Sequence, residues 1–189
     1  MDFQKRVSLY GFLFSSLVYL AVGSSSALAA DTYVGKRCRI CHIAETHAWE
    51  QTKMAKAFEL LKPGVAGDAK KTHKLDPTKD YTKDATCLPC HTTGYGKGGF
   101  QSLEATPDLA GVTCEVCHGA GGEYTKPTLM SLTNKEFKRA DVQAAGLILP
   151  DVKTCETCHN EKSPFYKPFD FEKRKAQGVH KIFEQKYKH

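Results

Sequence analysis

One five-residue pattern, C-x-x-C-H, occurs four times in this chain and uses every cysteine that the chain has. The four copies span residues 38–42, 87–91, 114–118 and 155–159. Two thiols three residues apart lie on one side of a single turn, where each can form a thioether with a haem vinyl group. The histidine that follows can bind the haem iron. The pattern therefore predicts four covalently bound haem c groups, one on each motif.

Each motif is predicted to supply two attachment residues and one proximal iron ligand. The attachment residues are Cys38, Cys41, Cys87, Cys90, Cys114, Cys117, Cys155 and Cys158. The proximal ligands are His42, His91, His118 and His159. Paired C-x-x-C sequences can also bind zinc, and an even number of cysteines can form disulfides. Neither alternative needs a histidine directly after every second cysteine, so haem attachment is the better interpretation, and no cysteine remains for a catalytic thiol.

The first 30 residues have the features of a secretory signal peptide. Two basic residues precede a mostly apolar run, residues 7–22, and residues 27–30 (Ala-Leu-Ala-Ala) offer a small-residue cleavage site. The alternative is a retained membrane anchor, but the apolar run is shorter than the roughly 18 residues that a spanning helix needs. We therefore expect residues 1–30 to be removed. The mature chain, 31–189, is then an exported protein and not an integral membrane protein.

The mature chain is short for four haems. About 160 residues suffice for one domain, and an ordinary apolar core is small at this size. The sequence thus predicts a single domain that is mainly α with long loops, organised around the haems. Helices are expected over 44–62, 141–146 and 171–186. The glycine-rich runs after the second and third motifs are expected to allow close approach to a porphyrin. These two motifs are the closest in sequence, so we expect their haems to be neighbours.

The formal net charge of +6 does not indicate nucleic-acid binding. The basic residues are scattered along the chain, and an exported protein rarely meets nucleic acid. The propionates of four haems add roughly eight negative charges, partly offset by ferric iron, so the loaded protein should be near neutral. We expect the lysine-rich stretches to be solvated surface, and docking to an acidic redox protein is a second use for them.

Several segments between and after the motifs resemble the tetrahaem cytochrome c-554 family and its multihaem relatives of the cytochrome c-552/4 type. They are residues 61–63, 74–77, 80–82, 90–96, 111–112, 114–121, 144–146, 155–159 and 169–170. The resemblance covers nearly the whole mature chain. It implies a compact, mainly helical tetrahaem fold in which haems stack in close pairs. It also implies that three haems have two protein ligands each, while the haem on His91 keeps an open distal face.

The distal ligands are where the chain departs from this family. Only His180 matches a distal histidine of the family directly, while Met54 stands where the family has another, and Met130 lies near the position of a third. Methionine binds haem iron and raises its potential relative to histidine. Met54, Met130 and His180 are therefore candidate distal ligands, and the alternative for Met54 and His180 is a place in the apolar core. His47 and His73 are weaker candidates, and His73 is expected to be exposed.

These observations predict an exported electron carrier that transfers electrons between redox partner proteins. The sequence identifies no donor, acceptor or oligomeric state. One alternative is a reductase of a small nitrogen or sulfur species, acting at an open haem on His91, and the resemblance adds that a nitric oxide reductase side activity is proposed for the family. A second alternative is a haem-stacked filament, in which His73 or His189 serves a neighbouring subunit.

Overall fold

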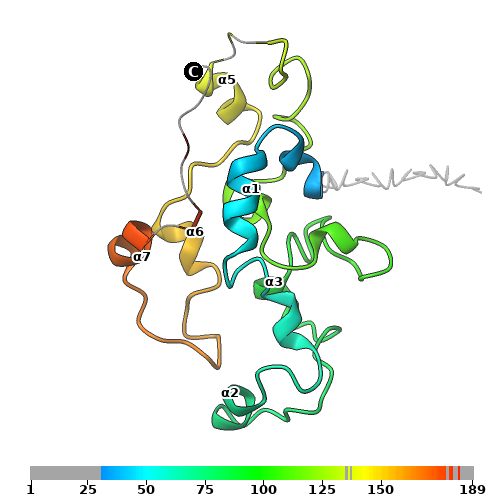
Figure 1. Cartoon of the computed structure of the whole chain (residues 1–189), viewed down its shortest axis with the longest axis vertical. Helices are drawn as coiled ribbons and strands as arrows, with labels where there is room; N and C mark the ends of the chain where they lie inside the picture. Colours follow the sequence, from blue (N-terminus) through cyan, green and yellow to red (C-terminus); the bar gives the residue numbers. More distant parts are fainter. Residues whose placement is uncertain (1–30, 135, 137, 178, 181–182, 184–189) are drawn as a thin grey trace, which may run out of the picture.

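The chain folds into short helices joined by turns and long loops (Figure 1). The structure is a computed structural model that describes residues 31–134, 136, 138–177, 179–180 and 183, and none of these lies in a β-strand. The α-helices are α1 (Ile43–Glu50), α2 (Gly67–Thr72), α3 (Leu88–His91), α4 (Cys114–His118), α5 (Arg139–Ala144), α6 (Val152–Glu156) and α7 (Phe171–Gln177). The 3₁₀ helices are η1 (Gly35–Ile40), η2 (Phe58–Leu61) and η3 (Pro107–Leu109). The predicted fold class, mainly α with long loops, is confirmed.

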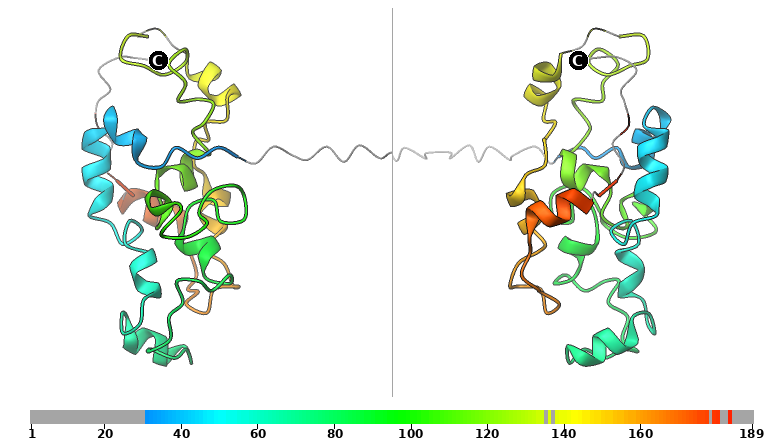
Figure 2. Two further views of the ribbon diagram at one scale, coloured as in Figure 1. Left: turned by 90° about the vertical axis from the view of Figure 1, so that its right-hand side faces the viewer. Right: turned by 60° about the vertical axis from the view of Figure 1, so that its left-hand side comes forward.

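The described part of the chain forms an elongated body. α2 lies near one end and α5 near the other, with α1 in the middle (Figure 1). The segment that carries α6 and α7 runs along one flank, which the two turned views also show (Figure 2). α2 and α5 carry no motif, and α3 and α6, which belong to the second and fourth motifs, lie between these two ends (Figure 1).

A small apolar cluster packs around the second motif. Its buried side chains are Phe58, Leu61, Tyr81, Leu88, Phe100 and Leu109. The rings of Phe58 and Phe100 have centroids 5.5 Å apart, and Leu88 belongs to the motif itself. Other large apolar side chains are open to solvent, among them Ile40 of the first motif, which is 68% exposed. A core of this size is what the short mature chain predicts.

The continuous helix predicted over 44–62 is wrong in its second half. α1 ends at Glu50, residues 51–57 form turns, and η2 follows. The stretch contains good helix formers and no glycine or proline before Pro63, so local propensity does not explain the break. The cause lies in contacts with distant parts of the chain.

Two backbone carbonyls in the broken stretch bind partners far away in the sequence. The Met54 carbonyl accepts the Val112 N–H at 3.3 Å, and the Ala57 carbonyl oxygen lies 2.6 Å from Nδ1 of His91. Each carbonyl also accepts a local N–H group, that of Ala57 at 3.1 Å and that of Leu60 at 3.3 Å. The turns and η2 therefore keep short-range hydrogen bonds, while the same carbonyls bind the segments that carry the second and third motifs.

The other two predicted helices are present with different ends. The helix expected over 141–146 is α5, and a glycine in the left-handed conformation follows it, as is common at helix ends. The helix expected over 171–186 is shorter, because α7 ends at Gln177 and residues 179–180 form a bend. The residue after Gln177 is a glycine, which favours a helix end there. Most of the remaining stretch lies outside the described residues.

The glycine-rich runs after the second and third motifs lie against residues 32–34. A Cβ atom on Gly94 would lie 2.4 Å from the ring of Tyr33, and one on Gly122 would lie 2.5 Å from Cβ of Thr32. The Gly122 N–H also donates to the Thr32 carbonyl at 2.8 Å. The close approach to a porphyrin stays a prediction, and the structure shows these runs in close approach to the polypeptide itself. This contact fixes the segment that leads into the first motif.

Candidate haem-attachment sites

All four motifs form short helical turns with the same internal bond. In the first, second and fourth motifs the histidine N–H donates to the carbonyl of the first cysteine, at 2.9, 3.2 and 3.0 Å, and the third motif forms α4. A single turn thus carries both thiols and the imidazole, as thioether attachment requires. All eight cysteines are free thiols. The local geometry of every motif fits an attached haem.

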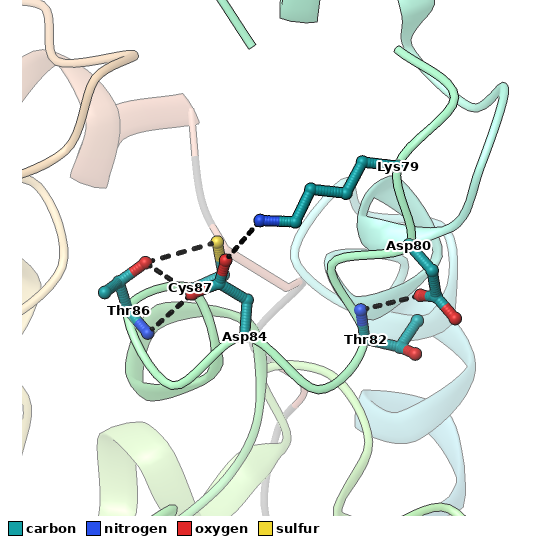
Figure 3. A network of polar contacts seen from close by, with 6 residues as sticks. All are labelled: Lys79, Asp80, Thr82, Asp84, Thr86 and Cys87. Carbon is teal, nitrogen blue, oxygen red and sulfur yellow. Dashed lines mark hydrogen bonds and ion pairs between the residues drawn. The ribbon is translucent and has the colours of Figure 1, made fainter. Parts of the chain in front are cut away.

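Side-chain hydrogen bonds fix the loop that leads into the second motif (Figure 3). One carboxylate oxygen of Asp84 accepts the Thr86 N–H at 3.0 Å and the Thr86 hydroxyl at 2.6 Å, and the other lies 3.3 Å from Nζ of Lys79. The Thr86 hydrogen bonds, with a smaller contribution from Lys79, hold the pKa of the Asp84 carboxyl below its usual value. The Asp84 carbonyl accepts the Cys87 N–H at 2.9 Å. This loop therefore fixes the first thiol of the motif.

Backbone carbonyls orient two of the proximal imidazoles. Nδ1 of His91 lies 2.6 Å from the Ala57 carbonyl oxygen, and Nδ1 of His118 lies 3.2 Å from that of Ile148. A carbonyl only accepts hydrogen bonds, so Nδ1 carries the proton and the lone pair is on Nε2. Metal-binding histidines commonly donate their other N–H in this way. The second and third motifs thus present Nε2 for iron.

The proximal imidazoles of the first and fourth motifs have side-chain neighbours. Nδ1 of His42 lies 4.0 Å from the Glu45 carboxylate. The ring of His159 stacks on Phe169, with centroids 4.6 Å apart and an interplanar angle of 22°. Burial lowers the pKa of His159, and the nearby Arg174 lowers it further. Both effects favour the neutral imidazole, which is the form that binds iron.

Thiols of different motifs lie close together in a defined order. The Cys38 and Cys114 thiols lie close enough to shift each other's pKa, which places the first motif beside the third, and the Cys90 and Cys158 thiols do the same for the second and fourth motifs. Burial raises the pKa of Cys117 to about 11, and Cys158 is close enough to contribute, so the third motif also lies near the fourth. The motifs therefore follow one another in space as first, third, fourth and second.

The second and third motifs are joined through their backbones rather than their thiols. Thr92 and Ala110 form an isolated antiparallel bridge, and the Gly111 N–H donates to the His91 carbonyl at 3.1 Å. Their short separation in sequence thus corresponds to backbone pairing. The expectation that their haems are neighbours stays a prediction. The thiols instead pair the third motif with the first, and the second motif with the fourth.

An open pocket beside the first motif suits the apolar face of a porphyrin. It has a volume of about 410 Å³ and is lined by Arg39, Ile40, Ile43, Thr46 and His47. Ile40 and Ile43 are 68% and 55% exposed. Covering an isoleucine side chain with an apolar surface contributes up to about 2 kcal/mol. The residues around the first motif therefore fit a haem, and His47 lies in the wall of this pocket.

Two of the three candidate distal ligands lie near the third motif. Met54 is half-buried, and its backbone is hydrogen-bonded to Val112 just before that motif. His180 is also half-buried; burial is the main cause that lowers the pKa of His118, and the proximity of His180 contributes. Met130 is half-buried in a turn-rich segment. Iron ligation by any of the three stays a prediction.

His73 is not exposed, contrary to expectation. It is half-buried, and its ring lies 4.5 Å from the ring of Phe165, centroid to centroid. No sequence signal predicts this contact, because the two residues are distant in the chain and His73 is surrounded by lysines. The ring contact ties the end of α2 to the segment after the fourth motif.

The described part of the chain supports neither zinc binding nor a membrane-spanning helix, the two alternatives weighed for the cysteines and for the apolar run. Within it, no three His, Cys, Asp or Glu side chains converge on a position that could hold a metal ion. None of its helices has the length and apolar character to cross a membrane. Residues 1–30, which contain the apolar run, are not described.

Sequence reasoning missed Glu115, whose carboxylate joins the first and third motifs. This side chain is 2% exposed, and it accepts the N–H groups of Val34, Gly35 and Gly121 at 2.9, 2.8 and 2.7 Å. The position is one of the variable positions of C-x-x-C-H, and the fourth motif has an exposed Glu156 in the same place. No sequence signal therefore separates the two glutamates.

Comparisons with known proteins identify the family of the chain. Residues 37–119 match the family model described as cytochrome c554 and c-prime. The chain is 38% identical over 173 residues to cytochrome c-554 of Nitrosomonas europaea, covering 84% of this chain and 74% of that protein. It is also similar to the solved structure of reduced cytochrome c554 from Nitrosomonas europaea, with a TM-score of 0.71, 33% identity, and coverage of 84% of this chain and 89% of that one. The chain therefore belongs to the cytochrome c554 family, as a multihaem c-type cytochrome of electron transfer with four covalently bound haem c groups.

Proposed function

We propose that this protein is an exported carrier whose four motifs form one row for electron transfer between redox partners. When bound, each haem accepts and releases one electron at its iron. The observation that carries the proposal is the set of contacts between thiols of different motifs. Each thiol marks the edge of the haem attached to it, so neighbouring thiols bring haem edges near one another. Because electron transfer slows steeply with distance, the preferred route is first, third, fourth and second.

Each motif is proposed to act with its own residues. The haem-attachment residues are Cys38, Cys41, Cys87, Cys90, Cys114, Cys117, Cys155 and Cys158, and the proximal ligands are His42, His91, His118 and His159. The Ala57 and Ile148 carbonyls hold two of these imidazoles in the tautomer that presents Nε2. Met54, Met130 and His180 are the proposed distal ligands.

The two ends of the row are the proposed docking places for partners. At the first motif Cys41 and His42 are exposed, and the neighbouring Arg37 and Arg39 are exposed as well. Exposed basic side chains around a redox centre favour an acidic partner and speed its association. Export is inferred from residues 1–30, whose pattern is that of a signal peptide.

Low-temperature paramagnetic resonance of the oxidised protein tests the row. Irons in neighbouring haems with edges near one another interact magnetically, so the expected spectrum contains coupled pairs rather than four independent signals. The carrier proposal also requires all four haems to be reduced through one end when a small protein donor is added. Four independent iron signals would contradict the proposed order.

A reductase acting at the haem on His91 is the second candidate, supported by the resemblance to a family in which this haem keeps an open distal face. The test is titration of the reduced protein with carbon monoxide. Uptake of about one molecule per chain supports an open site, while four low-spin irons without uptake remove the reductase and leave the carrier. The filament alternative predicts assembly with rising concentration, which light scattering measures.

A further inference from the structure

Glu115 places a buried negative charge between the first and third motifs. It lies next to Cys114 in the sequence, and its oxygens accept N–H groups from Val34 and Gly35, which lie four and three residues before Cys38 of the first motif. The carboxylate is 2% exposed. It is therefore within the region where the first and third motifs meet, and it is shielded from water.

The carboxylate accepts three backbone hydrogen bonds. An ionised carboxylate is a pure acceptor that satisfies all three donors. Its charge acts on its surroundings, because it contributes to the raised pKa of Tyr33 and Tyr124, after burial as the main cause in both. Among the described residues no ion pair neutralises it.

We infer that Glu115 sets the redox potentials of the haems on the first and third motifs, lowering both and thereby directing electrons toward the fourth and second motifs. A nearby negative charge favours the more positive, ferric state of a haem. The Coulomb effect is strong where water is excluded. This inference rests on the proposed attachment of haems to these motifs. It adds a direction to the row, since the end that holds Glu115 becomes the end that gives electrons up.

The fourth motif offers a matched control within the same chain. Glu156 occupies the same position in its motif as Glu115, between the two cysteines, but it is exposed. Water and salt screen an exposed charge. Neutralising Glu156 should therefore leave the potentials nearly unchanged, although the substitution is chemically identical and equally close to a motif in sequence.

The test compares three variants of the haem-loaded protein by potentiometric titration, with the haem methyl signals assigned to their motifs by nuclear magnetic resonance. In Glu115→Gln the midpoint potentials of the first and third haems shift upward. In Glu115→Asp, which keeps the charge and shortens the arm, these potentials stay low although stability falls. In Glu156→Gln all four potentials stay as in the unmodified protein.

Three outcomes would overturn the inference. The first is a Glu115→Gln protein with four haems and unshifted potentials, which leaves the carrier function intact. The second is an equal shift of the midpoint potentials in Glu115→Asp, which would assign the effect to the lost hydrogen bonds of the longer side chain rather than to its charge. If Glu115→Gln is not recovered with four haems, the order in which the haems of the unmodified protein are reduced tests the inference instead. The first and third haems should be reduced last. The third contrary outcome is that they are reduced first. Absence of haem from these motifs in the unmodified protein would instead refute the proposed function.

Discussion

Replacing Thr93 with valine should loosen the junction between the second and third motifs. Thr93 is fully buried. Its hydroxyl lies 2.8 Å from the Gly111 carbonyl oxygen and 2.9 Å from the Thr113 hydroxyl. The same hydroxyl accepts the Thr113 N–H at 3.0 Å. One hydroxyl offers one donor and two acceptors, so all its capacity is used. Valine keeps the shape of threonine and removes all three bonds.

The magnitude follows from the groups left behind. The Gly111 carbonyl and the Thr113 N–H lose their partner in a buried place. Each unsatisfied buried group costs about 1–3 kcal/mol. We therefore expect Thr93→Val to lower the free energy of unfolding by about 3 kcal/mol. With a urea slope of about 2 kcal/mol per molar, the midpoint of unfolding falls by roughly 1.5 M.

Urea unfolding followed by tryptophan emission measures this change. The chain has one tryptophan, Trp49, whose Nε1 donates to the Val112 carbonyl at 3.1 Å, next to the junction. Thr72→Val is the matched control, because that exposed hydroxyl bonds only to Asp68 of its own helix. The control should change stability by less than about 0.5 kcal/mol. If Thr93→Val is no more destabilising than the control, the junction does not carry the stability assigned to it.

Two further changes test the distal ligands and the packing of the third motif. Met54→His should abolish part of the near-infrared sulfur-to-iron band of the oxidised protein, and it should lower one midpoint potential by something on the order of 100 mV. If neither the band nor the potential changes, Met54 is a packing residue. Gly119→Ala should destabilise the protein by about 2 kcal/mol in thermal or urea unfolding, because Gly119 has φ +80° and a Cβ would lie 2.5 Å from the Gly146 carbonyl oxygen. A fully stable Gly119→Ala protein would refute this packing argument.

Features set by neighbours in the sequence were predictable. The C-x-x-C-H spacing predicted the turns that carry the motif cysteines and histidines. The glycines predicted close approach to a porphyrin, which stays a prediction, and the structure places them against residues 32–33. The helical class followed from the small core that a chain of this length can build. These inferences hold because a motif or a turn depends on a few consecutive residues.

Features set by distant contacts were not predictable. After α1 the Met54 and Ala57 carbonyls contact Val112 and His91, which are distant in the sequence, while each carbonyl also accepts a local N–H group. The spatial order of the motifs depends on which thiols meet, and sequence separation suggested a different pairing. Glu115 and Glu156 occupy equivalent motif positions, yet only the first is buried. The difference arises because residues 34–35 cover one motif and no corresponding segment of the described chain covers the other.

The mass of the purified, denatured protein tests the central claim most directly. The protein should be made in a host competent for haem attachment, so that the four motifs are processed as in an exported cytochrome. The account predicts the mass of the chain without residues 1–30 plus four haems. Proteolytic peptides around Cys38, Cys87, Cys114 and Cys155 should each carry one haem. Fewer than four haems, or cysteines recovered as disulfides or bound to zinc, would contradict the account.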